Sequence, residues 1–125
     1  MKTIRLILVL IFAIPHQDVQ ANNDLEKEKY LESLIIPKLK NWDSERIALL
    51  DMILMKMGVA EFLYFETIPP KVTLNEYIEM AKDYSTTQSG QFVNGILDNI
   101  RKDLEEEGKL QKTDFKKKSI KDTKN

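Results

Sequence analysis

The stretch from Ile68 to Ile100 most constrains the fold, because it carries two amphipathic helix patterns separated only by a short polar segment. Pro69 and Pro70 suit the entrance of the first helix, since N–H groups in a first turn have no intrahelical acceptor. The apolar positions that follow at helical spacing are Leu74, Ile78 and Ala81. They predict a helix over about residues 70–84. An alternative capping box at residues 73–76 would move its start by about three residues.

The polar segment 85–90 is rich in hydroxyl side chains, which compete for backbone hydrogen bonds and are expected to break the helix. The second helix should follow with an apolar stripe of Val93, Ile96, Leu97, Ile100 and Leu104. Gly95 lies inside it, where the missing side chain would let another backbone approach, at a cost of up to about 1 kcal/mol relative to Ala. Gly108 is the expected C-cap residue.

Residues 41–65 carry a longer pattern that is apolar on nearly all sides. Asn41 or Asp43 can cap its start. Such a helix is expected at the centre of a bundle, and Gly58 is expected to mark a close helix crossing. Upstream, a charged helix pattern should end near Pro37.

The fold class predicted from these patterns is all-α, a compact bundle of three to five helices. Trp42, the single tryptophan, is expected to cover the end of the core. The residues expected in the core are Ile53, Met57, Leu74, Ile78, Val93, Ile96 and Leu97.

Three pieces of the chain resemble the C-terminal half of NusB-type transcription antitermination factors. They are NWDSERIALLDMILMKMGVAEFLYF at 41–65, IPPKVTLNEYIEMAKDY at 68–84 and QFVNGILDNI at 91–100. The resemblance implies a NusB-like RNA-binding fold in the cytoplasm, with no membrane contact. It implies as partners a single-stranded, boxA-like RNA, a small-subunit ribosomal protein and other elongation factors. The same fold also occurs as an accessory domain of rRNA methyltransferases, which remains an alternative.

The region expected to contact RNA is the loop and helix start over residues 84–94. A helix N-terminus offers N–H groups to phosphate, hydroxyls and amides can add hydrogen bonds, and an aromatic ring can stack on an unpaired base. The expected RNA-binding residues are Tyr84, Ser85, Gln88, Ser89, Gln91, Phe92 and Asn94. Of these, the resemblance matches Gln91, Phe92 and Asn94 to RNA-contacting positions, although Phe92 is equally suited to the core. It also matches Asp51 to the ribosomal-protein contact, unless Asp51 pairs with a base such as Lys56.

Composition bounds the chemistry that the chain can perform. A length of 125 residues with 42% hydrophobic content fits one small domain. A balance of 19 basic and 20 acidic residues leaves no overall basic excess, so any RNA affinity must come from a local patch. The absence of cysteine and the single histidine argue against disulfides, thiolate metal sites and histidine clusters. No catalytic motif is present, so we expect no enzyme activity, cofactor or metal.

The two ends of the chain differ from its middle. Residues 1–21 have the pattern of a secretory signal peptide, with basic residues before a short apolar run. Three interpretations are open: an export signal of a secreted helical interaction protein, a gene-start artefact, or an apolar helix packed on the domain. We favour the artefact, and hence a truncated form, because the resemblance begins in mid-family. Residues 22–107 then form the helical domain, and residues 108–125, with seven Lys and two Asp, are expected to be a disordered basic tail, either solvated or in contact with RNA.

Overall fold

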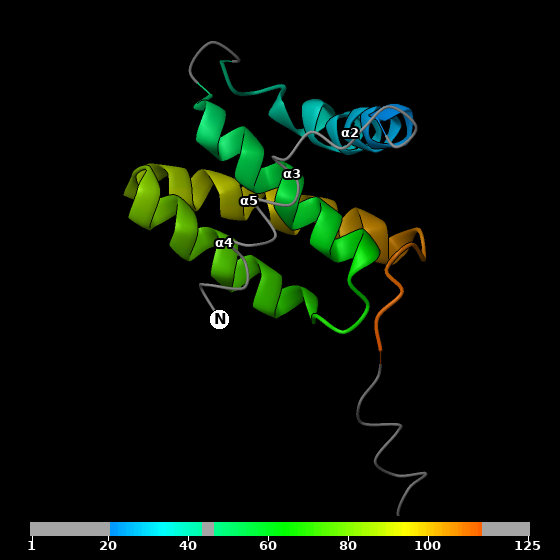
Figure 1. Cartoon of the computed structure of the whole chain (residues 1–125). Coiled ribbons are helices and arrows are strands. Elements are labelled where there is room, and N and C mark those ends of the chain that lie inside the picture. Colours follow the sequence, from blue (N-terminus) through cyan, green and yellow to red (C-terminus); the bar gives the residue numbers. More distant parts are fainter. Residues whose placement is uncertain (1–20, 44–46, 114–125) are drawn as a thin grey trace, which may run out of the picture.

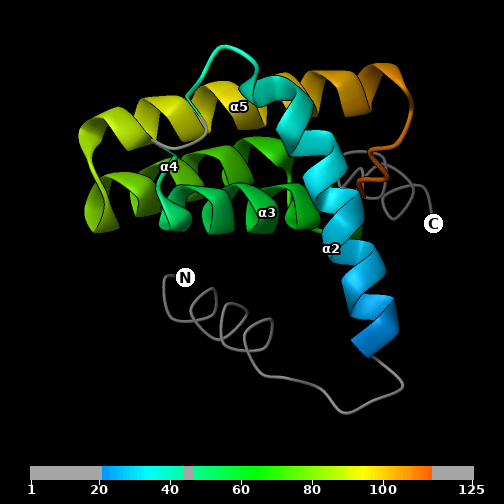
Figure 2. The same ribbon diagram turned by 90° about the horizontal axis from the view of Figure 1, so that it is seen from above.

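The chain folds into an all-α bundle in the computed structural model, which describes residues 21–43 and 47–113. The elements are α2 (Ala21–Ile35), the 3₁₀ turn η1 (Ile36–Leu39), α3 (Leu49–Tyr64), α4 (Pro70–Tyr84) and α5 (Thr87–Glu106). Helices α3, α4 and α5 lie lengthwise beside one another, and α2 runs across them (Figures 1 and 2). The all-α prediction is therefore confirmed. No helix within the described residues is long and apolar enough to cross a membrane.

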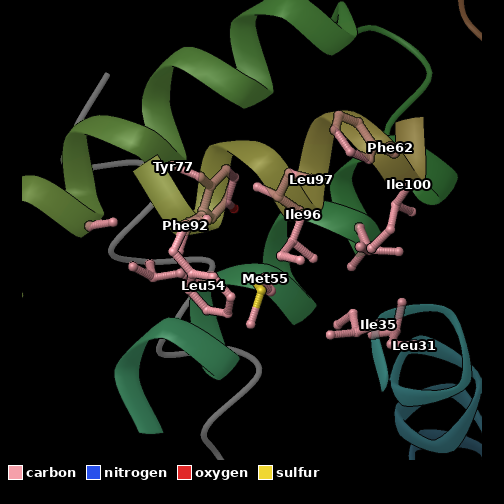
Figure 3. Packing of buried hydrophobic residues seen from close by; sticks show 14 of the residues in the cluster. Leu31, Ile35, Leu54, Met55, Phe62, Tyr77, Phe92, Ile96, Leu97 and Ile100 are labelled. Carbon is pink, nitrogen blue, oxygen red and sulfur yellow. The ribbon is translucent and has the colours of Figure 1, made fainter. Parts of the chain in front are cut away.

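Helix α3 packs against α2, α4 and α5, as its apolar pattern predicts, and α5 likewise packs against the other three helices. The close crossing of α3 with α5 occurs at Gly58, where an added Cβ would stand 2.9 Å from Cδ1 of Leu97. The buried side chains come from all four helices and meet around this crossing (Figure 3). They include Leu31, Ile35, Met55, Phe62, Tyr77, Leu97 and Ile100.

The predicted core residues are not all equally buried. Val93, Ile96 and Leu97 are buried as expected. Met57, Leu74 and Ile78 are half-buried. The prediction for Ile53 is wrong, because its side chain is 39% exposed. Three neighbouring helices cover only part of the circumference of α3, so an apolar pattern on all its sides leaves some apolar residues facing outward.

The observed helix ends agree only in part with the ends predicted from local sequence patterns. Helix α4 spans the predicted residues and starts at Pro70, so the capping box at 73–76 is not used. Helix α5 starts at Thr87, inside the segment expected to be a loop, because Thr86 acts as its N-cap. Helix α3 starts only at Leu49, after Ala48, and not at a cap provided by Asn41 or Asp43. Neither Ala48 nor Pro69 forms a side-chain cap hydrogen bond.

The C-terminal end of α5 is closed by Gly108, which has a positive φ of 66°. The N–H of Lys109 donates to the carbonyl of Leu104 at 2.9 Å, and the N–H of Gly108 donates to that of Glu105 at 3.1 Å. This pair of bonds is a Schellman motif, which needs a left-handed residue that glycine adopts without strain. The predicted C-cap is confirmed.

The chain continues past this cap onto the end of α3. The Nζ of Lys112 donates to the carbonyls of Glu61 at 2.9 Å and Phe65 at 2.8 Å, and the N–H of Thr113 donates to Glu66 at 2.9 Å. The carbonyls of Glu61 and Phe65 also accept the N–H groups of Phe65 and Ile68, so the ammonium group of Lys112 is a second donor to each of them. Burial lowers the pKa of Lys112 below 10.5. The first residues of the expected basic tail thus lie on the bundle, and residues 114–125 lie outside the described part of the chain.

Candidate nucleic-acid interface

The turn between α4 and α5 is built from hydroxyl side chains that bond to one another. Oγ1 of Thr86 accepts the N–H of Ser89 at 3.0 Å and lies 3.1 Å from the Ser89 hydroxyl. The hydroxyls of Ser85 and Ser89 are 2.9 Å apart. These groups first serve to start α5, because the first turn of a helix has N–H groups without intrahelical acceptors. A hydroxyl carries two lone pairs, so the cluster keeps some acceptor capacity for a ligand.

An open groove of about 370 Å³ lies between the outer faces of α4 and α5. Its lining residues are Asn75, Ile78, Glu79 and Lys82 from α4, and Gly90, Gln91 and Asn94 from α5. The two helices approach closely at Gly90, where an added Cβ would stand 2.6 Å from Cγ of Lys82. The groove therefore combines three amide side chains with one ammonium group and one carboxylate, and these two charged groups, of Lys82 and Glu79, are 3.6 Å apart.

Two of the groove residues, Gln91 and Asn94, are among those predicted from the sequence, and both are exposed. Gln88 is exposed one turn before Gln91. Asn75 and Lys82 were missed, because a polar helix face reads as an ordinary solvated surface until its neighbour is known. Their spacing places them on one side of α4, but nothing local indicates that this side borders α5.

The two aromatic residues predicted for this site lie in different environments. Tyr84, at the last residue of α4, is 65% exposed. Phe92 is only 8% exposed and belongs to the buried cluster. Its ring is covered by Trp42, with ring centroids 4.5 Å apart and planes inclined by 59°, and Trp42 itself is 52% exposed. Stacking of a base on Phe92 would therefore require Trp42 to move aside.

Charges on the outer face of α5 are concentrated in its second half. The guanidinium of Arg101 donates to the carboxylate of Asp98 at 2.8 and 2.9 Å and to Glu105 at 2.7 Å. The hydrogen bond from Arg101 holds the pKa of Asp98 below 3.8. Lys102 also pairs with Asp98, at 3.1 Å. The basic groups here are neutralised by neighbours, whereas the first turns of α5 present uncharged amides.

Asp51 lies within the bundle rather than on its surface. Its side chain is 4% exposed, and one of its oxygens is buried without a hydrogen-bond partner among the described residues. Lys56 reaches α2 instead and pairs with Glu28 at 2.8 Å and Glu32 at 2.6 Å. Over residues 21–43 and 47–113, no group of three or more His, Cys, Asp or Glu side chains could hold a metal ion.

The chain is an all-α bundle with a polar surface at the start of α5. The exposed aromatic rings of Tyr84 and Trp42 lie beside that surface. The chain belongs to the NusB family, which its residues 21–102 match. It is 48% identical over 82 residues to the transcription antitermination protein NusB of Salinibacter ruber, covering 66% of this chain and 51% of the relative. It is 40% identical over 92 residues to the protein of the same name from Chloroherpeton thalassium, covering 74% and 44%.

A third relative of that name, from Methylacidiphilum infernorum, is 46% identical over 78 residues, which cover 62% of this chain and 54% of the relative. The chain thus spans about half the length of the curated relatives that it matches. No solved structure matches the chain.

Proposed function

We propose that this chain is a transcription antitermination factor that binds single-stranded, boxA-like RNA in the cytoplasm. Its relatives carry the antitermination name, and the family match covers the described helices up to residue 102 of α5. The observation that carries the RNA proposal is the groove between α4 and α5, where amides of both helices converge beside a lysine.

The groove suits an unpaired nucleotide better than a duplex. Amide side chains both donate and accept hydrogen bonds, so Asn75, Gln91 and Asn94 can pair with the edge of an exposed base. The ammonium group of Lys82 is 3.6 Å from Glu79 in an exposed pair, and it can turn from that carboxylate to a phosphate next to the base. Sequence-specific recognition of RNA mostly targets such unpaired bases, because the deep groove of an RNA duplex hides their edges.

The test is titration of a short, fluorescently labelled single-stranded RNA, with its duplex form as the competitor. We expect the single strand to bind more tightly. Gln91→Ala and Asn94→Ala should each weaken binding about 2- to 12-fold, the equivalent of one hydrogen bond of about 0.5 to 1.5 kcal/mol. The matched controls are Gln111→Ala and Asn23→Ala, which remove exposed amides outside the groove. Equal effects of groove and control substitutions would refute the groove as the RNA site.

The basic tail would add affinity without sequence preference. Residues 114–125 contain five of the chain's lysines, and lysines attract RNA through phosphate neutralisation and counterion release. Lys112 is excluded from this role, because its ammonium group is bonded to carbonyls at the end of α3.

We also propose contact with a small-subunit ribosomal protein along α3, within a complex of elongation factors. The buried position of Asp51 makes it unsuitable as the contact. The outward-facing residues of the same helix are apolar: Leu49 is 77% exposed, and Ile53 follows one turn later. Exposed apolar side chains at this spacing present one continuous face to a partner.

A further inference from the structure

Trp42 stands at the edge of the first turns of α5, where its ring covers the buried Phe92 and still exposes about half of its own surface. The centroids of the two rings are 4.5 Å apart. A tryptophan held by a buried ring on one side and open on the other is a flat platform that costs little to order.

The surface of α5 connects this platform with the groove. Residues three and four apart are neighbours on a helix, so the exposed positions adjacent to Phe92 on α5 are Gln88 and Gly95. Gln91 in turn is adjacent to Gly95. Gln88, Gln91 and Gly95 are all exposed. Nothing lies within 4 Å of the place where a Cβ of Gly95 would stand, so the helix backbone is open to close approach at this point. The close approach expected at Gly95 is thus not made by another helix.

We infer that Trp42 is the base-stacking residue of this protein, and that a single-stranded RNA leaving the groove crosses α5 at Gly95 to place its next base on the Trp42 ring. This inference rests on the proposed RNA-binding function and assigns to Trp42 the stacking that the sequence pattern suggested for Phe92. The exposed residues between the groove and Trp42, which are Gln88, Gln91 and Gly95, carry no charge. A strand that crosses them is held by contacts to its bases and not by pairing of its phosphates, which supports a stacking role for Trp42.

The chain reports on this contact directly, since Trp42 is its single tryptophan. Titrating the full chain with unlabelled single-stranded RNA should change the tryptophan emission in parallel with binding measured on labelled RNA. Trp42→Leu keeps an apolar cover over Phe92 but removes the flat aromatic face. It should weaken binding about 5- to 150-fold with little change in salt dependence, and Trp42→Phe should restore much of the loss. Thermal unfolding followed by circular dichroism checks that each variant is folded.

The outcomes separate the inference from the proposed function. If the unchanged chain binds RNA but its emission does not respond, or folded Trp42→Leu binds as tightly as the unchanged chain, the inference is overturned and the proposed function stands. If the unchanged chain binds no single-stranded RNA, both are overturned. If emission responds to a small-subunit ribosomal protein and not to RNA, the ring belongs to a protein interface and the RNA inference is again overturned. Should Trp42→Leu unfold, the emission titration on the unchanged chain decides.

Discussion

Replacing Leu97 by Ala tests the central crossing of the bundle. Leu97 is fully buried, and its two Cδ atoms lie 2.9 and 3.0 Å from the place where a Cβ of Gly58 would stand. The substitution removes three buried carbons, worth about 2.4 kcal/mol of transfer free energy, and leaves a cavity against α3. We expect the free energy of unfolding to fall by about 3 to 5 kcal/mol, a large share of the total for a domain of this size.

The same contact predicts a rescue. Gly58→Ala alone gains up to about 1 kcal/mol of helix propensity but forces its Cβ into Leu97, at an overpacking cost of about 1 to 3 kcal/mol. In the Leu97→Ala background that clash is gone, and the new methyl group fills part of the cavity. The double variant should therefore be more stable than the sum of the two single changes by about 1 to 3 kcal/mol.

Urea unfolding followed by circular dichroism gives each of these free energies. The matched control is Leu104→Ala, which empties an equally buried site on α5, whereas the three atoms nearest to an added Cβ at Gly58 all belong to Leu97. Gly58→Ala should not rescue Leu104→Ala. Additive effects for Gly58 and Leu97, or equal rescue of both leucine variants, would refute the reasoning that Gly58 and Leu97 pack directly against each other.

Two further predictions concern the surface. Leu49 is 77% exposed, so Leu49→Ser should change the free energy of unfolding by no more than about 0.5 kcal/mol. It should weaken capture of a purified small-subunit ribosomal protein, with the candidate proteins tested one at a time. Unchanged capture would exclude α3 as the contact. Asp98→Asn should cost about 0.3 to 0.5 kcal/mol at pH 7, since the pair with Arg101 is partly exposed. Because the folded-state pKa of Asp98 is lowered, its contribution is present above 3.8 and is lost as the pH falls through the folded value. The urea midpoints of the variant and the unchanged chain should therefore converge in acid, and a constant gap would contradict this assignment.

Local sequence determined most of the helices, because their signals act within a few residues. Pro70 opens α4 at the predicted residue, and Gly108 closes α5 in a left-handed conformation that few other residues adopt. The apolar circumference of α3 correctly indicated a helix with neighbours on several sides, but the one-sided stripe of α5 did not show that α5 also packs against three helices. The sequence pattern predicts too late a start for α5, because the loop holds several hydroxyl side chains and only the structure shows that Thr86 is the one that caps the helix.

Only the tertiary structure decided which surfaces meet. Periodicity shows that a residue faces inward or outward on its own helix, but it cannot show which neighbour lies there. It therefore could not place Lys82 beside Gln91 in one groove, or bury Asp51 while leaving Ile53 exposed. The same limit applies to the aromatic pair. The sequence determined that two large rings are present, whereas the packing of Trp42 over α5 decided that Trp42 faces solvent and Phe92 lies beneath it.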